Sequence, residues 1–319
     1  MEKSARNATW LVATLIFGCS ADPGYQGRSS DDWIKDLRAP ENRRRVEAAD
    51  ALGKILLINP GSHNVVDALS VAVTDTSDEV RLAAATALTS DGVDPSGALG
   101  GFHALLHDSA HAYVRQEMAL LVGTLGVERG RMLMAPLSES LSDPDAGVRA
   151  AAVESLGMLG PATASQTNAI AKLASDADAG VRRAAIQSLL NLRAPADVTL
   201  RATRPALSDS SAPVRAAAAY ALWQLGREAE PAIPELMIAL NDESPSVRAA
   251  AAFALGGIGP AANRAKSALS RLLTDTAKSV ASEAAVALAA IDGRQVKPKP
   301  YAEPTTQERC SLGSRAPGC

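Results

Sequence analysis

The stretch Ser246–Gly259 reads SVRAAAAFALGGIG, and its skeleton is Val-Arg, a run of small residues, and then Ala-Leu about two helical turns later. The same skeleton appears as VRAAAVESLGMLG from Val148, VRRAAIQSLLNL from Val181 and VRAAAAYALWQLG from Val214. A skeleton that recurs at a nearly constant period identifies an array of repeats. The arginine marks the copies at Arg45, Arg81, Arg115, Arg149, Arg182, Arg215 and Arg248, and an eighth copy has Ala281 at this position.

The composition limits the classes of function. Of the 319 residues, 47% are apolar but only 3% are aromatic, and alanine supplies much of the apolar content. Alanine-rich helices cross closely, which favours a thin, extended core over a thick globular one. The net charge of −3 and the pI of about 5.9 give no hint of the basic stripe that nucleic-acid binders carry, so we expect no nucleic-acid partner.

The first 19 residues have the layout of a bacterial export signal. Lys3 and Arg6 give a short positive region, and the uncharged, mostly apolar run Ala8–Gly18 follows. A run of about 11 residues is too short to span a bilayer and fits the apolar part of a signal peptide. Residues 16–19, IFGC, resemble the bacterial lipobox, although that motif prefers Leu and then a small residue before the Gly-Cys pair.

The lipobox resemblance implies that Cys19 is lipidated and holds the protein at the bacterial cell envelope, at the outer membrane or the periplasmic face. Residues 20–29 are rich in Gly, Ser and Pro and are predicted to form a tether between this anchor and the array. Three alternatives remain open. They are a secreted protein without an anchor, a cytosolic protein with an apolar start, and a helix at Trp10–Phe17 that caps the array.

Each repeat has a second apolar pattern in front of the Val-Arg stretch. In the seventh repeat, Ile233, Leu236, Met237 and Leu240 lie on one face at helical spacing. Every repeat is therefore predicted to be a hairpin of a short helix A and a longer helix B. No segment alternates with a period of two over enough residues to predict a strand. The array is predicted to cover residues 30–292.

The turn between helix A and helix B contains a recurring aspartate, six residues before the marker position. A serine or aspartate follows two residues later in five of the repeats, and both are residue types that cap helix N-termini. The recurring aspartates are Asp75, Asp143, Asp176, Asp209, Asp242 and Asp275.

The pattern D-x-x-x-x-V-R-x-x-A-A-x-A-L-G resembles the short HEAT-like repeats of the bilin-lyase type. The resemblance implies an all-α fold, a right-handed α-solenoid of about eight helical hairpins. In that family the recurring Asp and Arg join turns and neighbouring helices in a hydrogen-bonded ladder, so the resemblance implies a structural role for them. The implied ladder residues are Arg81, Arg149, Arg182, Arg215, Arg248, Asp143, Asp176, Asp209 and Asp242.

Three aromatic residues are the candidate partner-binding site. In helical solenoids the B helices line the concave surface, which is the usual binding face. The residue five after the marker lies outside the apolar skeleton, and it is Tyr220 in the sixth repeat and Phe253 in the seventh. Trp223 lies one turn from Tyr220, and aromatic residues are favoured anchors in interfaces. The alternative is that these three side chains fill gaps between alanine-rich helices.

Three histidines at a spacing of four would align as metal ligands if they shared one helix. They are His103, His107 and His111. The repeat frame places the first two on a helix A and His111 at the start of the next helix B, so we expect no metal site. A distorted site that includes Asp108 or Glu117 is the alternative.

Some HEAT-like families are enzymes, so an enzyme or enzyme accessory of the bilin-lyase or hydroxylase kind is an alternative function. The hydroxylases of this fold use His-Glu pairs, and none of the 4 histidines here is followed by glutamate. Bilin lyases act in the cytosol, which fits poorly with an export signal. No Gly-rich phosphate loop is present. We therefore expect no catalytic residues and no cofactor.

Residues 293–319 are polar, rich in proline and without periodicity, so they are predicted to be disordered. If Cys19 is lipidated, Cys310 and Cys319 are left as a pair that could join in an oxidising compartment. Two unpaired thiols are the alternative.

Together these features predict a non-enzymatic scaffold that binds another protein at the bacterial cell envelope and is held to the membrane by a lipid. A structural spacer without a defined ligand is a further alternative.

Overall fold

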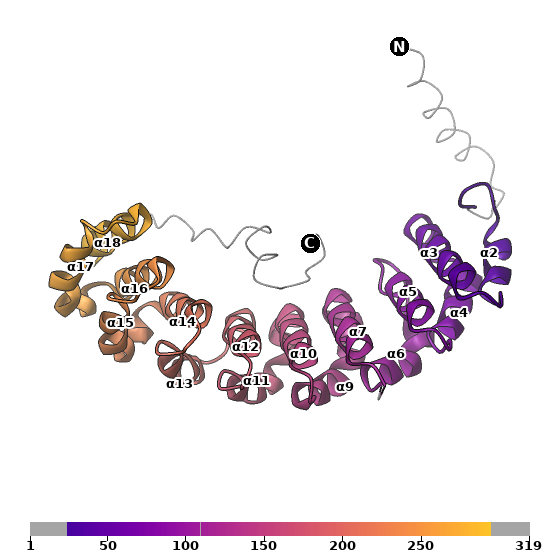
Figure 1. Cartoon of the computed structure of the whole chain (residues 1–319), viewed down its shortest axis with the longest axis horizontal. Coiled ribbons are helices and arrows are strands. Elements are labelled where there is room, and N and C mark those ends of the chain that lie inside the picture. The colour runs from indigo at the N-terminus through magenta and orange to yellow at the C-terminus, as the bar shows by residue number, and fades with distance from the viewer. Residues whose placement is uncertain (1–23, 109, 295–319) are drawn as a thin grey trace, which may run out of the picture. The chain divides into compact units, whose positions relative to one another are not determined.

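The computed structural model describes residues 24–108 and 110–294, and its regular secondary structure is helical (Figure 1). One isolated bridge joins Tyr25 and Arg28, and no strand occurs among the described residues. The chain divides into two compact units, Met1–Ala194 and Pro195–Cys319. In both units the helices follow one another as hairpins, which confirms the predicted all-α solenoid.

In its described part, unit 1 repeats the predicted hairpin of a short helix A and a longer helix B. The B helices lie side by side in one layer, and the A helices form the other layer (Figure 1). The A helices are α2 (Ser30–Asp36), α4 (His63–Ala72), α6 (Leu99–Leu106), α9 (Met134–Glu139) and α11 (Thr167–Leu173). The B helices are α3 (Asn42–Ile58), α5 (Asp78–Leu88), α7 (Ala112–Thr124), α10 (Ala146–Leu159) and α12 (Ala179–Asn191), and α8 (Gly126–Gly130) follows α7.

Unit 2 repeats the same hairpin, with its B helices again in one layer (Figure 1). Short 3-10 segments, η5 (Gly226–Ala232) and η6 (Gly259–Ala265), connect each B helix to the next A helix. The A helices are α13 (Ala196–Ala206), α15 (Ile233–Ala239) and α17 (Lys266–Leu272), and the B helices are α14 (Ala212–Leu225), α16 (Pro245–Ile258) and α18 (Lys278–Ile291).

The ends of the B helices follow from local sequence. Asp145 and Asp178 cap α10 and α12, because each carboxylate accepts the backbone N–H three residues later, at 3.2 Å and 3.0 Å. Ser211 and Ser244 occupy the same cap position but make no side-chain cap bond. Helix α16 ends at Gly259, whose φ of +75° is a left-handed conformation that glycine adopts without strain.

The repeated skeleton forms the core of each unit. The valine before the marker and the leucine seven residues after it are fully buried in successive repeats. Burying one such side chain contributes roughly 1.5–3 kcal/mol. These residues are Val148, Leu156, Val181 and Leu189 in unit 1 and Val214, Leu222, Val247 and Leu255 in unit 2.

Neighbouring B helices approach closely at a glycine eight residues after the marker. A Cβ atom added to Gly157 of α10 would lie 2.6 Å from Oγ of Ser188 on α12, and that hydroxyl donates to the carbonyl of Val153 at 2.9 Å. Such a distance leaves no space for a side chain on the glycine. The same pairing joins Gly53 to Ala87, Gly123 to Ser155 and Gly256 to Ala287.

The last part of the predicted tether, residues 24–29, is not free of the array. The indole N–H of Trp33 on α2 donates to the carbonyl of Tyr25 at 3.2 Å. The guanidinium of Arg28 lies 3.8 Å from the centroid of the Trp33 ring and pairs with Asp36 at 2.8 Å. The tether prediction is therefore wrong for these residues, because a cation–π contact and two polar contacts fold them onto α2.

The predicted export signal with Cys19 lies outside the described residues. The tail from residue 295 onward, with Cys310 and Cys319, lies outside them as well. Within the described ranges, no helix combines the length and the apolar character that a membrane span needs.

We expect Gly157→Ala to destabilise unit 1, although alanine has the higher helix propensity. Overpacking costs about 1–3 kcal/mol, whereas the propensity gain is about 1 kcal/mol. Gly100→Ala in α6 is the matched control, because a Cβ there meets nothing within 4 Å. Thermal unfolding followed by circular dichroism measures both variants. A Gly157→Ala protein that melts as high as the control would contradict the close approach of α10 and α12.

Candidate functional site

The ladder arginines each join two successive turns. Arg149 donates from Nη1 to the carbonyls of Asp143 at 2.9 Å and Pro144 at 3.1 Å, which lie in its own turn. It also donates from Nε and Nη2 to the carboxylate of Asp176 in the following turn, at 2.8 Å and 2.7 Å. Oδ1 of Asp176 accepts the backbone N–H of Asp178 at 2.9 Å. One arginine therefore fixes its own turn and binds the next.

The same arrangement recurs in both units, with an aspartate side chain that is 8–15% exposed in every pair. Such bidentate, charge-assisted contacts are stronger than neutral hydrogen bonds. Hydrogen bonds from the arginine hold the pKa of Asp176 below its ordinary value, against the opposing effect of burial. The pairs are Arg45–Asp75, Arg115–Asp143 and Arg149–Asp176 in unit 1, and Arg215–Asp242 and Arg248–Asp275 in unit 2.

Two of the predicted ladder residues flank the boundary between the units. Arg182 donates from Nη1 to the carbonyls of Asp176 at 2.8 Å and Ala177 at 2.9 Å, in its own turn. Asp209 accepts the backbone N–H of Ser211 at 2.8 Å. Both residues thus stabilise their own turns as the other members of the series do.

The sequence frame missed one aspartate of this series, Asp108. Its Oδ1 accepts the backbone N–H groups of Ala110 at 2.8 Å and His111 at 2.9 Å, and its carbonyl accepts Nη1 of Arg115 at 2.7 Å. It lies seven residues before Arg115 instead of six, because this turn contains one additional residue. A search that allowed one insertion in the turn would have found it.

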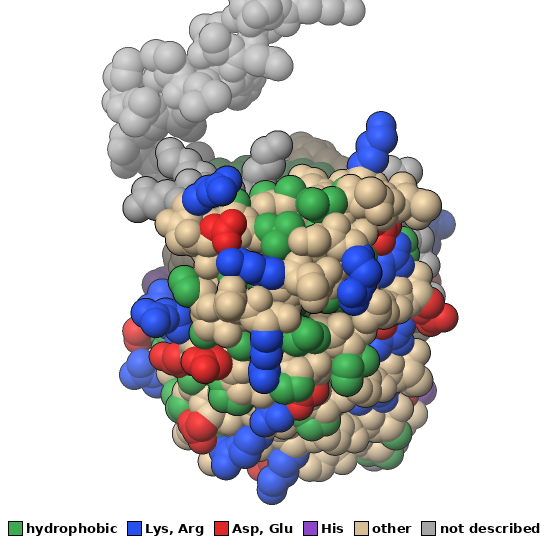
Figure 2. All heavy atoms as spheres, turned by 90° about the vertical axis from the view of Figure 1, so that its left-hand side faces the viewer, with side chains coloured by type: hydrophobic (Ala, Val, Ile, Leu, Met, Phe, Trp, Pro, Cys, Tyr) green, Lys and Arg blue, Asp and Glu red, His purple; other side chains and the backbone are tan. Residues whose placement is uncertain are grey.

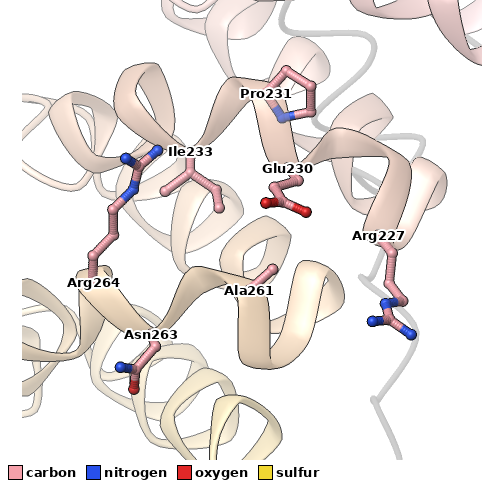
Figure 3. A pocket seen from close by; sticks show the side chains of 7 residues that line it. All are labelled: Arg227, Glu230, Pro231, Ile233, Ala261, Asn263 and Arg264. Atoms are coloured by element: carbon pink, nitrogen blue, oxygen red, sulfur yellow. The ribbon is translucent and has the colours of Figure 1, made fainter.

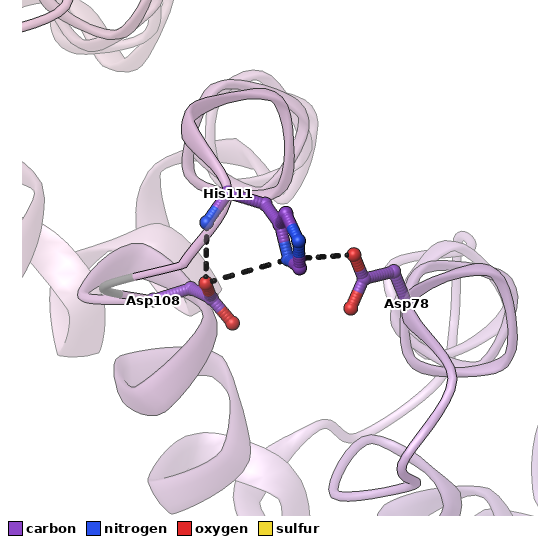
Figure 4. A group of neighbouring side chains, drawn as sticks. All are labelled: Asp78, Asp108 and His111. Atoms are coloured by element: carbon purple, nitrogen blue, oxygen red, sulfur yellow. Dashed lines mark hydrogen bonds and ion pairs between the residues drawn. The ribbon is translucent and has the colours of Figure 1, made fainter.

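The contact between α5 and the turn before α7 departs from the ladder (Figure 4). Arg81 reaches Asp108 at 2.8 Å and also Asp78, both through Nη2 alone. Its buried Nε has no hydrogen-bond partner among the described residues. Nδ1 of His111 lies 2.9 Å from Oδ2 of Asp78, and the hydroxyl of Tyr113 donates to the same carboxylate. A network of five side chains replaces the bidentate pair at this position.

Asp78, Asp108 and His111 offer three ligand atoms within 4.8 Å of one another, so they are the group that could hold a metal ion. An ion would have to displace Arg81 from both carboxylates. Burial would raise the pKa of Asp108, but backbone N–H groups and Arg81 hold it below its ordinary value. The hydrogen bond to Asp78 raises the pKa of Tyr113 to about 12. Apart from Nε of Arg81, the groups of this network pair with one another, and they fit an ion-pair network better than a metal site.

The three histidines do not meet in one place. The rings of His103 and His107 stack with centroids 4.5 Å apart, and Nε2 of His107 lies 2.9 Å from Glu139 on α9. His111 contacts Asp78 instead, as the repeat frame indicates. The alternative metal site therefore has other residues than the sequence indicated. His111 and Asp108 lie together with Asp78, which the sequence did not suggest, and Glu117 is not part of the group.

In unit 1 the position five after the marker is exposed in three repeats, as Asp50, Thr86 and Glu154. It is half-buried in the other two, as Leu120 and Gln187. In unit 2 the same position is Tyr220 on α14, which is half-buried, Phe253 on α16, which is 5% exposed, and Val286 on α18, which is half-buried. The position is therefore fully or partly exposed in every repeat except the seventh, where Phe253 is buried.

Tyr220, Trp223 and Phe253 form one stack that runs from α14 to α16. The ring centroids of Tyr220 and Trp223 are 5.3 Å apart, and those of Trp223 and Phe253 are 4.5 Å apart with an interplanar angle of 24°. Phe253 is buried against Trp223, which fits the alternative that this side chain fills a gap between helices. The accessible part of the stack, called here the aromatic strip, consists of Tyr220 and Trp223.

Trp223 stands at the position that glycine occupies in four other repeats, eight residues after the marker. A Cβ atom added to Gly257 of α16 would lie 2.6 Å from Cδ1 of Trp223. The two glycines therefore allow two close contacts. Gly256 leaves space for Ala287 of α18, and Gly257 leaves space for the indole of Trp223. Sequence reasoning missed Gly257, although a second glycine beside the frame glycine was its signal.

The helices that carry the aromatic strip have little charge. In α14 and α16, the ladder arginines Arg215 and Arg248 are the only charged residues. The B helices of unit 1 carry further charged residues, such as Asp50, Glu117 and Glu154. An uncharged surface with two aromatic residues suits an apolar or aromatic ligand group better than an ionic one.

A second feature of unit 2 is an open groove of about 720 Å³ between η5 and η6 (Figure 3). Glu230 and Ile233 line its middle, whereas Arg264 and Arg227 lie toward its two sides (Figure 3). The charges are mixed, and the charged side chains Arg227, Glu230 and Arg264 are exposed. On the end of unit 2 formed by α17 and α18, acidic, basic and apolar side chains are also interspersed, without a continuous stripe of one charge (Figure 2). Neither surface indicates a single kind of ligand.

Comparison with known proteins supports the repeat assignment. The sequence profile of HEAT repeats matches residues 99–190 and 233–299. No sequence among the curated proteins matches the chain.

Solved structures share the architecture at low sequence identity. YibA of Escherichia coli is 13% identical, with a TM-score of 0.57 over 90% of this chain and 98% of that one. A Kap121p mutant is 16% identical, with a TM-score of 0.53 over 82% of this chain and 33% of that one. The CpcE–CpcF complex of phycocyanin lyase from a Nostoc species is 20% identical, with a TM-score of only 0.42. For YibA and Kap121p, identities this low show a likeness of fold alone.

We expect Arg149→Ala to lower the free energy of unfolding by about 2–4 kcal/mol, because it leaves a largely buried carboxylate without its partner. The two side chains are 15% and 9% exposed. Arg43→Ala is the control, since the Arg43–Glu47 pair is 89% and 54% exposed. Its loss should change stability by about 0.5 kcal/mol or less. Urea unfolding of both variants measures the difference, and equal effects would contradict the ladder.

The difference in the free energy of unfolding between wild type and Arg149→Ala should become smaller in acid. The folded pKa of Asp176 lies below that of the unfolded chain, which is about 3.9. Its stabilisation is therefore fully present above that value and is lost as the pH falls through the folded pKa. Urea unfolding at about pH 7 and about pH 2.5 compares the two states of the carboxylate. A difference that persists unchanged in acid would show that Asp176 is not the partner.

Proposed function

We propose, from the HEAT repeats of which this chain is built, that the protein is a non-enzymatic scaffold that binds another protein. The observation that carries the proposal is the stack of Tyr220, Trp223 and Phe253 on α14 and α16. Two of its rings, those of Tyr220 and Trp223, are half-buried and so remain partly accessible. The binding surface is the aromatic strip with the uncharged helix faces around it.

The strip has the properties of an interface anchor. Tyr and Trp combine a large apolar area with a polar tip and lose little conformational entropy on binding. Trp223 is held in place from two sides, by Phe253 and by the backbone at Gly257. A preorganised ring needs no ordering when a partner binds, so more of the contact energy appears as affinity. The partial exposure of both rings favours a binding surface over a spacer without a ligand.

The place of action is the bacterial cell envelope. Residues 16–19 resemble a lipobox, and lipidation of Cys19 would hold the array at a membrane while the repeats stay in the aqueous compartment. The partner is then another envelope protein, at the outer membrane or the periplasmic face. The anchor and the binding surface belong to different parts of the chain, and they are tested separately.

Capture from detergent extracts of the host envelope tests the binding surface. The full chain should retain a partner, and Tyr220→Ala with Trp223→Ala should weaken retention about tenfold or more, as expected for interface anchors. The control is Thr86→Ala with Glu154→Ala, two exposed residues on B helices of unit 1 that share the frame position of Tyr220. Melting curves of both double variants confirm that the fold is intact. A partner retained equally by both double variants would contradict the aromatic strip, and no partner at all would contradict the scaffold.

Cys19→Ser tests the anchor. The wild-type protein should fractionate with the host membranes and carry an acyl chain that mass spectrometry detects on the Cys19 peptide. The variant should lose the acyl mass and move to the soluble fraction. Cys310→Ser is the control and should leave the fractionation unchanged. A wild-type protein without an acyl chain on Cys19 would refute the lipid anchor.

A further inference from the structure

The aromatic strip has the chemistry that binds proline-rich peptide. Extended proline-rich segments dock on surfaces lined by Trp and Tyr, because their preformed helix loses little entropy on binding. Tyr220 and Trp223 lie side by side with ring centroids 5.3 Å apart, on helices without charge beyond the ladder arginines. The indole N–H of a tryptophan such as Trp223 is a hydrogen-bond donor that suits a peptide carbonyl.

The chain itself contains such a segment. Residues 297–304 read KPKPYAEP, with a proline at 298, 300 and 304. Residues 300–302, Pro-Tyr-Ala, form an uncharged centre between a lysine and a glutamate. This centre matches the uncharged surface around the strip, and the flanking charges suit the aqueous rim.

The segment is long enough to reach the strip. Arg294 is the last described residue and follows directly on α18, which ends at Ile291. Within unit 2, α18 packs against α16 and α16 against α14. Neighbouring helices lie about 8–10 Å apart, so α14 is roughly 16–20 Å from α18. An extended chain covers about 3.3 Å per residue, so about six residues beyond Arg294 bring Pro300 to the strip.

We infer that residues 297–304 occupy the aromatic strip of the same molecule as a tethered ligand. The inference rests on the proposed function, because it concerns the same surface and states the chemistry of what binds there. A partner that uses the strip presents a similar proline-rich segment and displaces the one in the tail. The tail therefore competes with a partner for the strip. A partner must bind tightly enough to displace a tethered ligand whose effective concentration is in the millimolar range.

Fluorescence anisotropy with a labelled peptide of residues 295–306 tests this inference on the full chain. In the tail variant, Pro298→Ala, Pro300→Ala and Pro304→Ala together remove the competing segment. The tail variant should bind the peptide at least about tenfold more tightly than wild type, because the tethered segment competes in the wild type. Equal affinities for the two proteins would overturn the intramolecular occupant.

Two further measurements identify the site and the chemistry. Adding Trp223→Leu to the tail variant should weaken peptide binding about tenfold or more, and Tyr220→Ala provides an independent second variant. Gln224→Ala, an exposed neighbour on α14, is the matched control. A peptide with its prolines replaced by alanine should also bind about tenfold less tightly. The inference would be refuted if correctly folded Trp223 and Tyr220 variants bound the peptide with unchanged affinity. It would also be refuted if replacing the prolines left the affinity unchanged.

The molecular mass in solution shows whether the segment that occupies the strip belongs to the same molecule or to a second copy. A wild-type protein that dimerises on concentration, while the tail variant stays monomeric, would place the segment on a second copy and overturn the intramolecular arrangement. The proposed function fails separately. Capture of a partner that depends on Trp223, together with no peptide binding, contradicts only the proline-rich ligand. Peptide binding without any Trp223-dependent partner contradicts only the scaffold.

Discussion

The contact on which the array depends is one guanidinium group shared by two successive turns. Nη1 satisfies the carbonyls of its own turn, and the Nε and Nη2 edge satisfies the aspartate of the next. That aspartate also accepts a backbone N–H of its own turn, so loss of the arginine would leave polar groups of both turns without partners. Each alanine-rich helix buries little apolar area, so the thin core alone does not fix how one repeat sits on the next. The polar contacts between successive turns fix that position.

A second constraint, the close approach at the frame glycine, explains how a surface for binding arises in a regular array. Where glycine faces a small residue, the neighbouring B helices come into close contact. Trp223 replaces that glycine in the sixth repeat, and its ring needs space on α16 that Gly257 provides. The ring then covers Phe253 and lies beside Tyr220. The candidate site is thus a local exception to the rule that builds the fold.

The period of the repeat was enough to predict the hairpins, their order and the buried skeleton, because each repeat meets the same neighbours as the one before. Departures from the period were harder to predict. Asp108 was missed because its turn has one more residue. Sequence alone left open whether Phe253 lies at the surface or fills a gap, because its burial depends on a contact with Trp223 of the preceding repeat. The fold of residues 24–29 onto α2 depends on Trp33 and Arg28, which meet only in three dimensions.

The ladder also has a consequence for how such a chain can evolve. A regular hairpin, such as the one with Asp242 and Arg248, carries an aspartate that accepts from the preceding arginine and an arginine that donates to the following aspartate. Duplication or deletion of one hairpin in the gene therefore leaves every joint with a matched pair, provided that the cut falls at the same place in the frame. The number of repeats can therefore change easily during evolution. A tryptophan in place of the frame glycine, in contrast, needs a second substitution in the neighbouring repeat, such as the glycine at 257. The array can gain members in one event, but a site on it requires at least two.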